Sequence, residues 1–331
     1  MARGQPIKVF RLDDHKNVIQ SAAKGLLSLI LSAVKDFFLG YLNMKTASKP
    51  IFVKNALRPV VIAGPCMAES ADLLEATVLP LTRLARELDF QLVFKSSFDK
   101  ANRSSIEGYR GPGLDQAMAW FSEIKSRHGV KILTDVHETA QCRPAAEVCD
   151  VLQIPAFLCR QTDLIVEAVQ TGRAVNIKKG QFMAPHAMAN IAAKAVAAAK
   201  AGNFGVDVAL TERGASFGYG NLVVDMRAFP VMAKSGTPLI FDITHSTQLP
   251  GAATDGKSSG ADREFAPVLA RAAVATGYLD GFFLEVHPEP AKAKSDKEAQ
   301  LSIPQAEAML RQLVPFWHHC RKLTEIDSKF V

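Results

Sequence analysis

The chain lacks a paired cysteine motif. Its 331 residues include five cysteines, an odd number, and no two of them have the spacing C-x-x-C. Small secreted proteins that depend on disulfides usually have an even number of cysteines at regular spacings, and disulfides are rare in the reducing cytoplasm. The sequence therefore offers no disulfide framework and predicts a cytoplasmic protein. Any role for a cysteine must follow from its position.

The chain also lacks an excess of charge of one sign over most of its length. It has 39 Lys and Arg and 33 Asp and Glu, which gives a formal net charge of +6. Residues 1–50 hold eight of the basic and three of the acidic residues, so residues 51–331 hold 31 and 30 and are nearly neutral. A nucleic-acid-binding domain usually has a basic face, and nothing here predicts one. With 48% hydrophobic and 22% charged residues, the composition is ordinary for a soluble globular enzyme.

No uninterrupted apolar run is long enough to cross a bilayer, which takes about 20 predominantly apolar residues. The nearest candidate is residues 21–42, where polar side chains recur at three- and four-residue steps: Ser21, Lys24, Ser28, Ser32 and Lys35. This spacing predicts an amphipathic α-helix with one polar face. The segment is a poor signal peptide, because a lysine breaks the apolar run and no clear small-residue cleavage site follows. Two readings stay open: a peripheral membrane contact, or a dispensable extension of residues 1–43 with Met44 as a natural start.

After Pro50, short β-branched and apolar runs alternate with longer helical stretches such as residues 73–89 and 186–201, as repeated βαβ units require. The predicted strands are residues 60–66, 91–97, 131–136, 150–156, 174–180, 206–214, 238–245 and 282–287. Eight strands with intervening helices favour a closed barrel over an open sheet. We therefore predict a single (β/α)8 barrel, the TIM barrel, over residues 44–331, preceded by a helical extension over residues 1–43.

Nearly every predicted strand ends in a polar or ionisable side chain. The residues at these ends are Cys66, Lys95, Asp135, Gln153, Lys178, Arg213, His245 and Glu285. One such residue would be unremarkable, but a full set is typical of a barrel whose active site lies at the carboxyl ends of its strands.

The segment FKSSFDKANRSS, residues 94–105, carries Lys95 and Lys100 followed by Asn102, Arg103 and Ser104. Cations followed by an arginine and hydroxyl donors suit phosphate. Taken alone, the segment could be a solvated surface loop. Two further cations end other strands, however, and four cations at one barrel mouth would repel each other unless anions bind there.

Several segments resemble the 3-deoxy-manno-octulosonate 8-phosphate synthases over essentially all of residues 50–325. They are IAGPCMAES, FKSSFDKANRSS, ILTDVHE, DVLQIPAFLCRQTDL, NIKKGQFMAP, TERGASFGYGNLVVDM, FDITHSTQLPG and LEVHPEPAKAKSD. The resemblance implies an enzyme that condenses phosphoenolpyruvate with arabinose 5-phosphate. The related 3-deoxy-arabino-heptulosonate 7-phosphate synthases, which use erythrose 4-phosphate, typically carry a KPRTS-like motif where this chain has KANRSS.

The resemblance also implies roles for individual residues. Phosphoenolpyruvate would be bound by Lys95, Ser97, Lys100, Lys178 and Arg213, with Gln153 nearby. Arabinose 5-phosphate would be bound at its phosphate by Asn102, Arg103 and Ser104 and at its hydroxyls by Asp135. Ser258, in a loop over residues 248–264 whose composition predicts a mobile cover, would also meet the aldose phosphate. Phe157 and Arg160 would reach a neighbouring subunit's site, which implies a homotetramer. The candidate catalytic residues are Lys95, Lys100, Asp135, Lys178, Arg213 and His245.

A second set of residues predicts a metal site. Cys66, His245 and Glu285 end the first, seventh and eighth strands, which are neighbours in a closed barrel, and Asp296 lies in the loop after the eighth. Singly, each has an ordinary structural explanation. Together, a thiolate, an imidazole and two carboxylates suit Zn²⁺ or Fe²⁺ better than Mg²⁺, with Mn²⁺ and Co²⁺ as further candidates. In the family that the chain resembles, metal-dependent members carry cysteine at the first-strand position and metal-independent members carry asparagine. We therefore expect one divalent ion.

Three other functions stay open on the sequence. The first is a heptulosonate 7-phosphate synthase, and the second is an aldolase that forms a Schiff base at Lys178. The third is a non-catalytic barrel held at a membrane by residues 21–42. The intact set of candidate ligands and cations argues against the third, because a scaffold would not need all of them.

Overall fold

The structure is a computed structural model that describes residues 49–102, 106–216, 218–250, 260–325 and 329. The chain divides between Lys49 and Pro50, and the barrel lies in residues 50–331. The helix predicted at residues 21–42 lies outside the described residues, as do three predicted site residues, Arg103, Ser104 and Ser258. Within the described ranges, no helix combines the length and the apolar character needed to cross a membrane.

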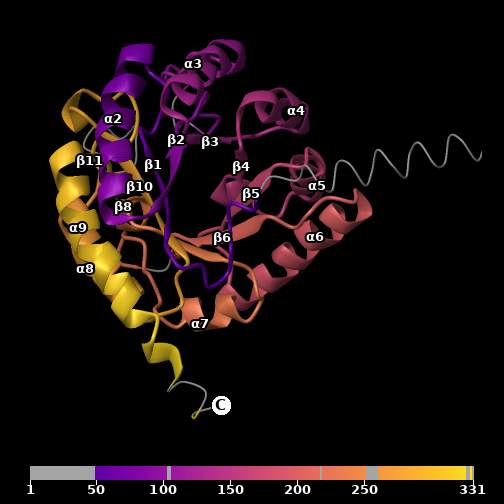
Figure 1. Cartoon of the computed structure of the whole chain (residues 1–331), viewed down its shortest axis with the longest axis vertical. Coiled ribbons are helices and arrows are strands. Elements are labelled where there is room, and N and C mark those ends of the chain that lie inside the picture. The colour runs from indigo at the N-terminus through magenta and orange to yellow at the C-terminus, as the bar shows by residue number, and fades with distance from the viewer. Residues whose placement is uncertain (1–48, 103–105, 217, 251–259, 326–328, 330–331) are drawn as a thin grey trace, which may run out of the picture. The chain divides into compact units, whose positions relative to one another are not determined.

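Eight parallel strands close into a barrel (Figure 1). They are β1 (Val60–Gly64), β2 (Gln91–Lys95), β3 (Lys131–Asp135), β4 (Val151–Ile154), β5 (Ala174–Lys178), β6 (Val208–Glu212), β7 (Leu239–Asp242) and β10 (Gly281–His287). Each strand pairs with the next, and β1 closes the ring by pairing with β10 from Val60 opposite Gly281 to Gly64 opposite Glu285. The predicted (β/α)8 fold is therefore confirmed. Most strands are shorter than predicted, because several of the polar residues assigned to their ends lie in the loops that follow.

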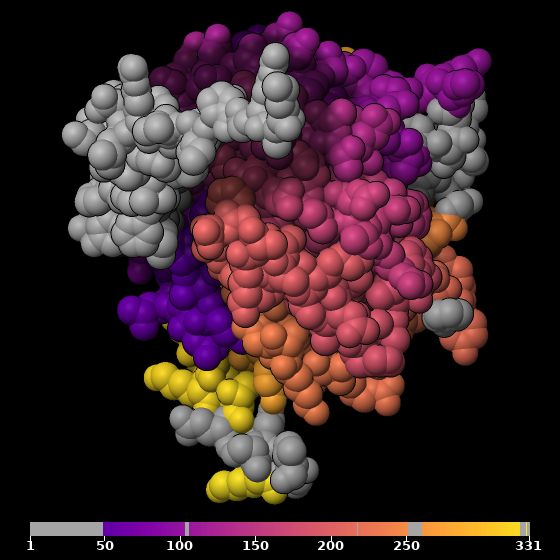
Figure 2. Space-filling view, turned by 90° about the vertical axis from the view of Figure 1, so that its right-hand side faces the viewer, coloured from indigo at the N-terminus to yellow at the C-terminus, as the bar shows by residue number. Residues whose placement is uncertain are grey.

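Helices surround the strands in the view of Figure 1. They are α2 (Ala71–Leu88), α3 (Leu114–His128), α4 (Thr139–Val148), α5 (Thr162–Gln170), α6 (Met188–Ala201), α7 (Ala228–Ala233), α8 (Ala266–Ala275) and α9 (Ile303–Cys320). The first of them shows why these segments are helical. The Ser70 side chain caps its first turn by accepting the Leu73 N–H, and its buried residues recur at three- and four-residue steps from Leu74 to Leu84. Figure 2 shows the side of the barrel where residues of α4, α5 and α6, in pink and coral, form its outer surface.

Short elements connect these units. They are the 3-10 turns η1 (Ala156–Leu158), η2 (Pro185–Ala187), η3 (His245–Thr247), η4 (Arg263–Phe265), η5 (Pro290–Lys292) and η6 (Leu323–Glu325) and the two-residue strands β8 (Gln248–Leu249), β9 (Gly260–Ala261) and β11 (Leu301–Ser302). The antiparallel pair β8–β9 lies between β7 and α8 along the chain, and β11 extends the sheet beside β10. The first pairing includes Gln248, and the second begins one residue after Gln300.

The barrel interior is filled by apolar side chains from alternate positions of the strands, such as Ile62, Val93 and Leu133. Ile51 and Phe52 join this cluster from the chain before β1, and their N–H groups donate to the Asp207 carboxylate at 2.7 and 2.9 Å. In the part of the chain that the structure describes, the amino-terminal end of the barrel is therefore closed by a floor, and the carboxyl ends of the strands form its open end.

Candidate active site

A cavity of ≈ 360 Å³ lies at the carboxyl ends of the barrel strands. Most of the residues predicted from the sequence line it: Lys95, Ser97, Lys100, Asn102, Asp135, Gln153, Phe157, Lys178, Arg213, His245, Glu285 and Asp296. They come from strands β2 to β10 and from the loops after them, so residues far apart in the sequence face one space. Four further polar residues that line the cavity were not predicted from the sequence: His137, Gln181, Gln248 and Ser295.

Two described residues of the predicted set do not line this cavity. Cys66, which follows β1, is completely buried. Arg160 is exposed after η1, and its neighbour Phe157 lines the cavity with 57% of its surface accessible. An exposed aromatic side chain beside a cavity fits the predicted contact with another subunit, and that contact stays a prediction.

Two of the predicted lysines are paired with buried carboxylates. The Lys95 ammonium donates to Glu285 Oε1 and, at 3.0 Å, to the Cys66 carbonyl oxygen. The Lys178 ammonium donates to Asp242 Oδ2 at 2.7 Å and lies 3.7 Å from the centre of the Phe283 ring. All four of these charged side chains are buried. The expectation that the cations repel each other until an anion binds is therefore incomplete, because the barrel supplies carboxylates of its own.

Lys100 and Asp135 form a second charged group on the β2 and β3 side. The Lys100 ammonium donates to Ser97 Oγ at 2.9 Å, and His137 Nε2 lies 3.1 Å from Asp135 Oδ2. Burial raises the pKa of Asp135, but the charge of Lys100 and the hydrogen bond from His137 outweigh it and hold that pKa well below its usual range. Asp135 is therefore an ionised acceptor, which suits a ligand rich in hydroxyl groups.

Arg213 follows β6 and is held from its backbone and from its side chain. The Glu212 carboxylate accepts the N–H groups of Arg213 and Gly214 at 3.0 and 2.6 Å. Arg213 Nη2 donates to Gln248 Oε1, while Nη1 is buried and has no hydrogen-bond partner among the described residues. A guanidinium with one edge fixed and one edge free is set up to bind an anion.

The cavity contains other buried polar atoms without a partner. Among the described residues that line it, these atoms are Asp135 Oδ1, His137 Nδ1, Gln181 Oε1, Arg213 Nη1, Glu285 Oε2 and Ser295 Oγ. A buried polar group without a hydrogen bond costs about 1–3 kcal/mol, and native proteins contain few of them. Their concentration around one cavity indicates a site for a polar, multiply charged ligand.

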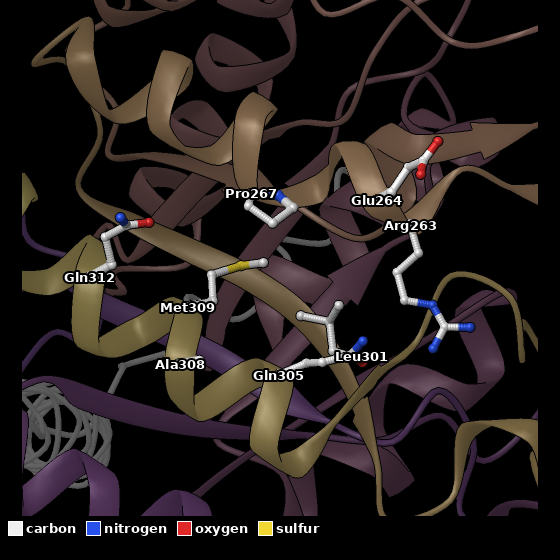
Figure 3. Close-up of a pocket in the computed structure, with 8 residues that line it drawn as sticks. All are labelled: Arg263, Glu264, Pro267, Leu301, Gln305, Ala308, Met309 and Gln312. Carbon is white, nitrogen blue, oxygen red and sulfur yellow. The ribbon is translucent and has the colours of Figure 1, made fainter.

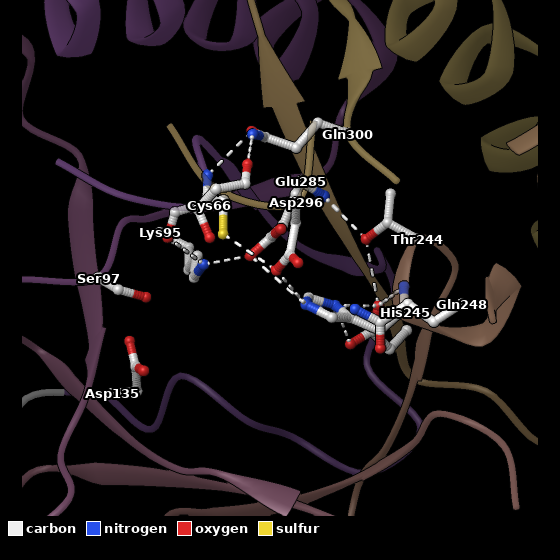
Figure 4. Close-up of polar contacts among 12 residues, drawn as sticks. Cys66, Lys95, Ser97, Asp135, Thr244, His245, Gln248, Glu285, Asp296 and Gln300 are labelled. Atoms are coloured by element: carbon white, nitrogen blue, oxygen red, sulfur yellow. Dashed lines mark hydrogen bonds and ion pairs between the residues drawn. The ribbon is translucent and has the colours of Figure 1, made fainter. Parts of the chain in front are cut away.

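The predicted metal ligands converge beside this cavity (Figure 4). Ligand atoms of Cys66, Glu285 and Asp296 all lie within 4.8 Å of one another, and Cys66 Sγ lies 3.3 Å from Asp296 Oδ2. His245 Nε2 lies beside this group, at 3.7 Å from Glu285 Oε1 and 3.9 Å from Asp296 Oδ2, but it does not lie within 4.8 Å of all three ligand atoms. Three predicted donors therefore form a close cluster, and the fourth lies at its edge.

The chemistry of these donors fits a divalent cation. Burial, followed by the Glu285 carboxylate, raises the pKa of the Cys66 thiol, and a bound divalent cation would favour its ionised form. Burial also raises the pKa of Glu285, but Lys95 and His245 outweigh it and keep this carboxyl ionised. One sulfur, one nitrogen and two oxygens suit Zn²⁺ or Fe²⁺.

Asp242, at the end of β7, is a further residue that the sequence analysis missed. It is completely buried and accepts the His245 N–H at 2.9 Å, and its carboxylate lies 2.9 and 3.1 Å from His245 Nδ1. This pairing leaves Nε2 of the ring facing Glu285 and Asp296, as a metal-binding histidine requires. The available signal was an ionisable residue inside an otherwise apolar strand, LIFD.

A second cavity, of ≈ 530 Å³, lies between η4 and the start of α8 on one side and α9 on the other (Figure 3). Pro267, Leu301 and Met309 contribute apolar surface to it, and Arg263 lies at its edge. None of the predicted site residues lines it. This cavity is larger, but the charged and polar side chains predicted for catalysis line the first cavity.

Comparison with known proteins gives a consistent result. Residues 43–318 match the DAHP synthetase I family. Curated relatives named 2-dehydro-3-deoxyphosphooctonate aldolase include a protein of Trichlorobacter lovleyi, 52% identical over 77% of this chain and 90% of its own length. One from Granulibacter bethesdensis is 50% identical over 79% of this chain and 90% of its length. Another, from Rhodopseudomonas palustris strain BisB5, is 54% identical over 79% of this chain and 89% of its length.

Proposed function

The chain belongs to the DAHP synthetase I family, and on this basis we propose that it condenses phosphoenolpyruvate with D-arabinose 5-phosphate and water. The products are 3-deoxy-D-manno-octulosonate 8-phosphate and inorganic phosphate. The relatives named as octonate aldolases support the eight-carbon product. The observation that carries the proposal is the cavity where cationic side chains and partnerless buried polar atoms meet.

In the proposed reaction, carbon 3 of phosphoenolpyruvate forms a bond to the aldehyde carbon of the aldose, whose oxygen takes up a proton. Water adds at carbon 2 and gives up one proton. The bond between carbon 2 and the phosphate oxygen then breaks, the new hydroxyl at carbon 2 loses its remaining proton to become the keto group, and the phosphate leaves with that proton. No protein side chain needs to bond covalently to the substrates. The work of the barrel is to hold two polyanions in reacting geometry and to offset their repulsion.

The side chains around the cavity divide this work. Arg213, Lys178, Lys95 and Lys100 suit the phosphate and carboxylate of phosphoenolpyruvate, and the partnerless Arg213 Nη1 can donate to it without breaking an existing bond. Asp135 suits the hydroxyl groups of the aldose. Arg103 and Ser104, with Asn102, are proposed for the aldose phosphate on the strength of the sequence motif.

We also propose a resident divalent ion held by Cys66, His245, Glu285 and Asp296. If bound there, the ion would supply a Lewis acid. Glu285, which pairs with Lys95 in this structure, would then serve both as a ligand and as the partner of that lysine. A homotetramer in the cytoplasm, with Phe157 and Arg160 reaching a neighbouring site, completes the proposal.

The test is an assay of phosphate release from phosphoenolpyruvate with each of two aldoses. Arabinose 5-phosphate should be strongly preferred over erythrose 4-phosphate, because the motif reads KANRSS. Equal use of both aldoses, or a preference for the shorter one, would overturn the specific assignment in favour of a heptulosonate 7-phosphate synthase. Arg103→Ala should raise the KM for arabinose 5-phosphate more than that for phosphoenolpyruvate, since a charge-assisted hydrogen bond contributes about 1.5–3 kcal/mol.

The same assay, run with borohydride, separates the proposal from a Schiff-base aldolase. Burial lowers the pKa of Lys178, while the Asp242 carboxylate opposes that change and holds the nitrogen in an ion pair. We expect borohydride in the presence of both substrates to leave the enzyme active and Lys178 unmodified. Covalent trapping at this lysine would show that it acts as a nucleophile.

A further inference from the structure

Gln300 links the loops that carry two of the four metal-binding candidates (Figure 4). It is completely buried immediately before β11 and does not line the cavity. Its Oε1 accepts the backbone N–H of Cys66 at 3.0 Å, and its Nε2 donates to the carbonyl oxygen of Ser295 at 2.8 Å. One side-chain amide therefore ties the chain after β1 to the chain after β10.

The loop from Ser295 to Gln300 is also closed on itself. Asp296 has a φ of 44°, in the left-handed region that few residues other than glycine adopt and that aspartate tolerates better than most. Its carbonyl oxygen accepts the N–H groups of Ala299 and Gln300 at 3.0 and 3.1 Å. The Asp296 side chain is therefore aimed by a tight backbone turn, and Gln300 forms the end of that turn.

A side chain on the outer side holds the same loop. Arg263 of η4 donates from Nε to the Glu298 carbonyl oxygen at 2.9 Å and from Nη2 to the Lys297 carbonyl oxygen at 3.2 Å. The loop is thus fixed at its outer edge by an arginine and at its inner edge by Gln300. Only the inner contact reaches a second metal-binding candidate.

We propose that Gln300 is a positioning residue of the metal centre, which sets the separation of the Cys66 thiol and the Asp296 carboxylate before an ion binds. This inference rests on the metal centre proposed above. The other two donors are oriented by different partners, Glu285 by Lys95 and His245 by Asp242. Gln300 provides the corresponding support for the remaining pair. Partners of this kind typically change metal affinity 10- to 100-fold when they are removed.

The experiment is a Co²⁺ titration of metal-free wild-type protein, Gln300→Met and Gln305→Met, followed by the thiolate-to-cobalt charge-transfer absorption. Methionine is similar in length to glutamine and makes neither hydrogen bond. Gln305 is a matched control in the same segment, because its side chain accepts the Ser302 N–H in the capping box of α9 and lines the second cavity instead of the first. We expect Gln300→Met to bind Co²⁺ about 10- to 100-fold more weakly, with an altered charge-transfer band. Gln305→Met should match the wild type.

Kinetics add a second readout. At saturating metal, Gln300→Met should lower kcat while leaving the KM for phosphoenolpyruvate close to that of the wild type, because the anion-binding cations are untouched. If wild-type protein binds Co²⁺ with the thiolate band but Gln300→Met shows the same affinity and band, the positioning role is overturned and the metal centre stands. If the wild type shows no thiolate band, the metal centre fails, and this inference fails with it.

Amide hydrogen exchange of the wild type tests the proposal without any variant, in case Gln300→Met does not fold. Peptides that contain Cys66 and residues 295–300 should be protected in the metal-free protein and gain little protection with Co²⁺. Rapid exchange in the metal-free protein, with protection appearing only after Co²⁺ is added, would mean that the ion assembles the loop and that Gln300 does not prearrange it.

Discussion

The two ends of the barrel differ in how their buried carboxylates are paired, although Asp150 and Asp280 at the floor also form ion pairs with lysine or arginine side chains. At the floor, Asp150, Asp207 and Asp280 each stand immediately before a strand and accept backbone N–H groups, such as those of Ile132, Phe52 and Leu239. At the mouth, Asp135, Asp242 and Glu285 lie at or near strand ends, and they pair mainly with ionisable side chains that line the same cavity.

The carboxylates at the two ends of the barrel also differ in whether each oxygen has a hydrogen-bond partner. Among the described residues, the three floor carboxylates have no buried oxygen without a hydrogen-bond partner, whereas Asp135 and Glu285 at the mouth each have one. A carboxylate that holds backbone groups contributes to folding. One that balances a lysine and keeps a free oxygen contributes to a site whose remaining partners arrive with the ligand. Floor variants should therefore lose stability, while mouth variants should lose activity.

The largest effect should come from the metal centre at the mouth. A chelator should abolish turnover, and Zn²⁺, Fe²⁺, Mn²⁺ or Co²⁺ should restore it. Cys66→Ala should lower kcat at least about a hundredfold, because a metal Lewis acid contributes several kcal/mol of transition-state stabilisation. Its effect on the urea midpoint should be small. Cys66→Asn should retain more activity than Cys66→Ala, since the asparagine amide can form a hydrogen bond where the ion would lie. Full-rate turnover by wild-type protein shown to be metal-free by elemental analysis would contradict the metal centre.

The second-largest effect should come from Asp242, a mouth carboxylate whose replacement should lower both activity and stability. Asp242→Asn should lower kcat about 10- to 100-fold through the orientation of His245. It should also destabilise the protein by about 3–5 kcal/mol, because Lys178 is left buried without its carboxylate. Phosphoenolpyruvate should recover part of that stability, since its anionic groups can pair with the lysine. Thermal denaturation with and without the ligand measures this. If phosphoenolpyruvate raises the Tm of Asp242→Asn no more than it raises that of the wild type, Asp242 behaves like a floor residue.

The sequence predicted the barrel and most of the mouth for one physical reason. Parallel strands that close a ring bring their carboxyl ends together, so residues such as Lys95 and His245 could be placed near each other from strand order alone. Gln300 could not be found in this way, because its contact with the Cys66 N–H joins residues 234 positions apart and leaves no local pattern in the sequence. Asp242 left one signal, an ionisable residue at the end of an otherwise apolar strand, but its pairing with Lys178, 64 positions away, could not be predicted.

The third-largest effect should be a loss of stability when a floor carboxylate, Asp207, is replaced. Asp207→Ala should remove the acceptor of two backbone N–H groups, those of Ile51 and Phe52, which are both buried. An unpaired buried donor costs about 1–3 kcal/mol, so the free energy of unfolding should fall by about 2–4 kcal/mol in urea denaturation. The values of kcat and KM should not change, and phosphoenolpyruvate should stabilise the variant only as much as the wild type. Asp207→Asn, which keeps one acceptor, should lose about half as much stability. A lower kcat in fully folded Asp207→Ala would contradict the expectation that floor carboxylates affect stability and not activity.

The smallest effect is a dependence of stability on pH at Asp150. Burial raises the pKa of this carboxyl, but the hydrogen bond from the Ile132 N–H and the pairing with Lys125 and Lys131 outweigh it, so the pKa in the folded protein lies below its ordinary value. The unfolded chain therefore takes up the proton first as pH falls. The stabilisation from ionised Asp150 is complete above its unfolded pKa, near 3.9, and is lost as pH falls from there through the lower folded value.

Asp150→Asn keeps an acceptor for Ile132 and loses two ion pairs with partly exposed lysines, which should cost about 1 kcal/mol at neutral pH. Urea denaturation of both proteins at pH 7 and at pH 3 measures the difference, which should shrink at the lower pH. A difference that stays constant between the two pH values would mean that the carboxylate charge contributes nothing and that the hydrogen bond alone accounts for Asp150.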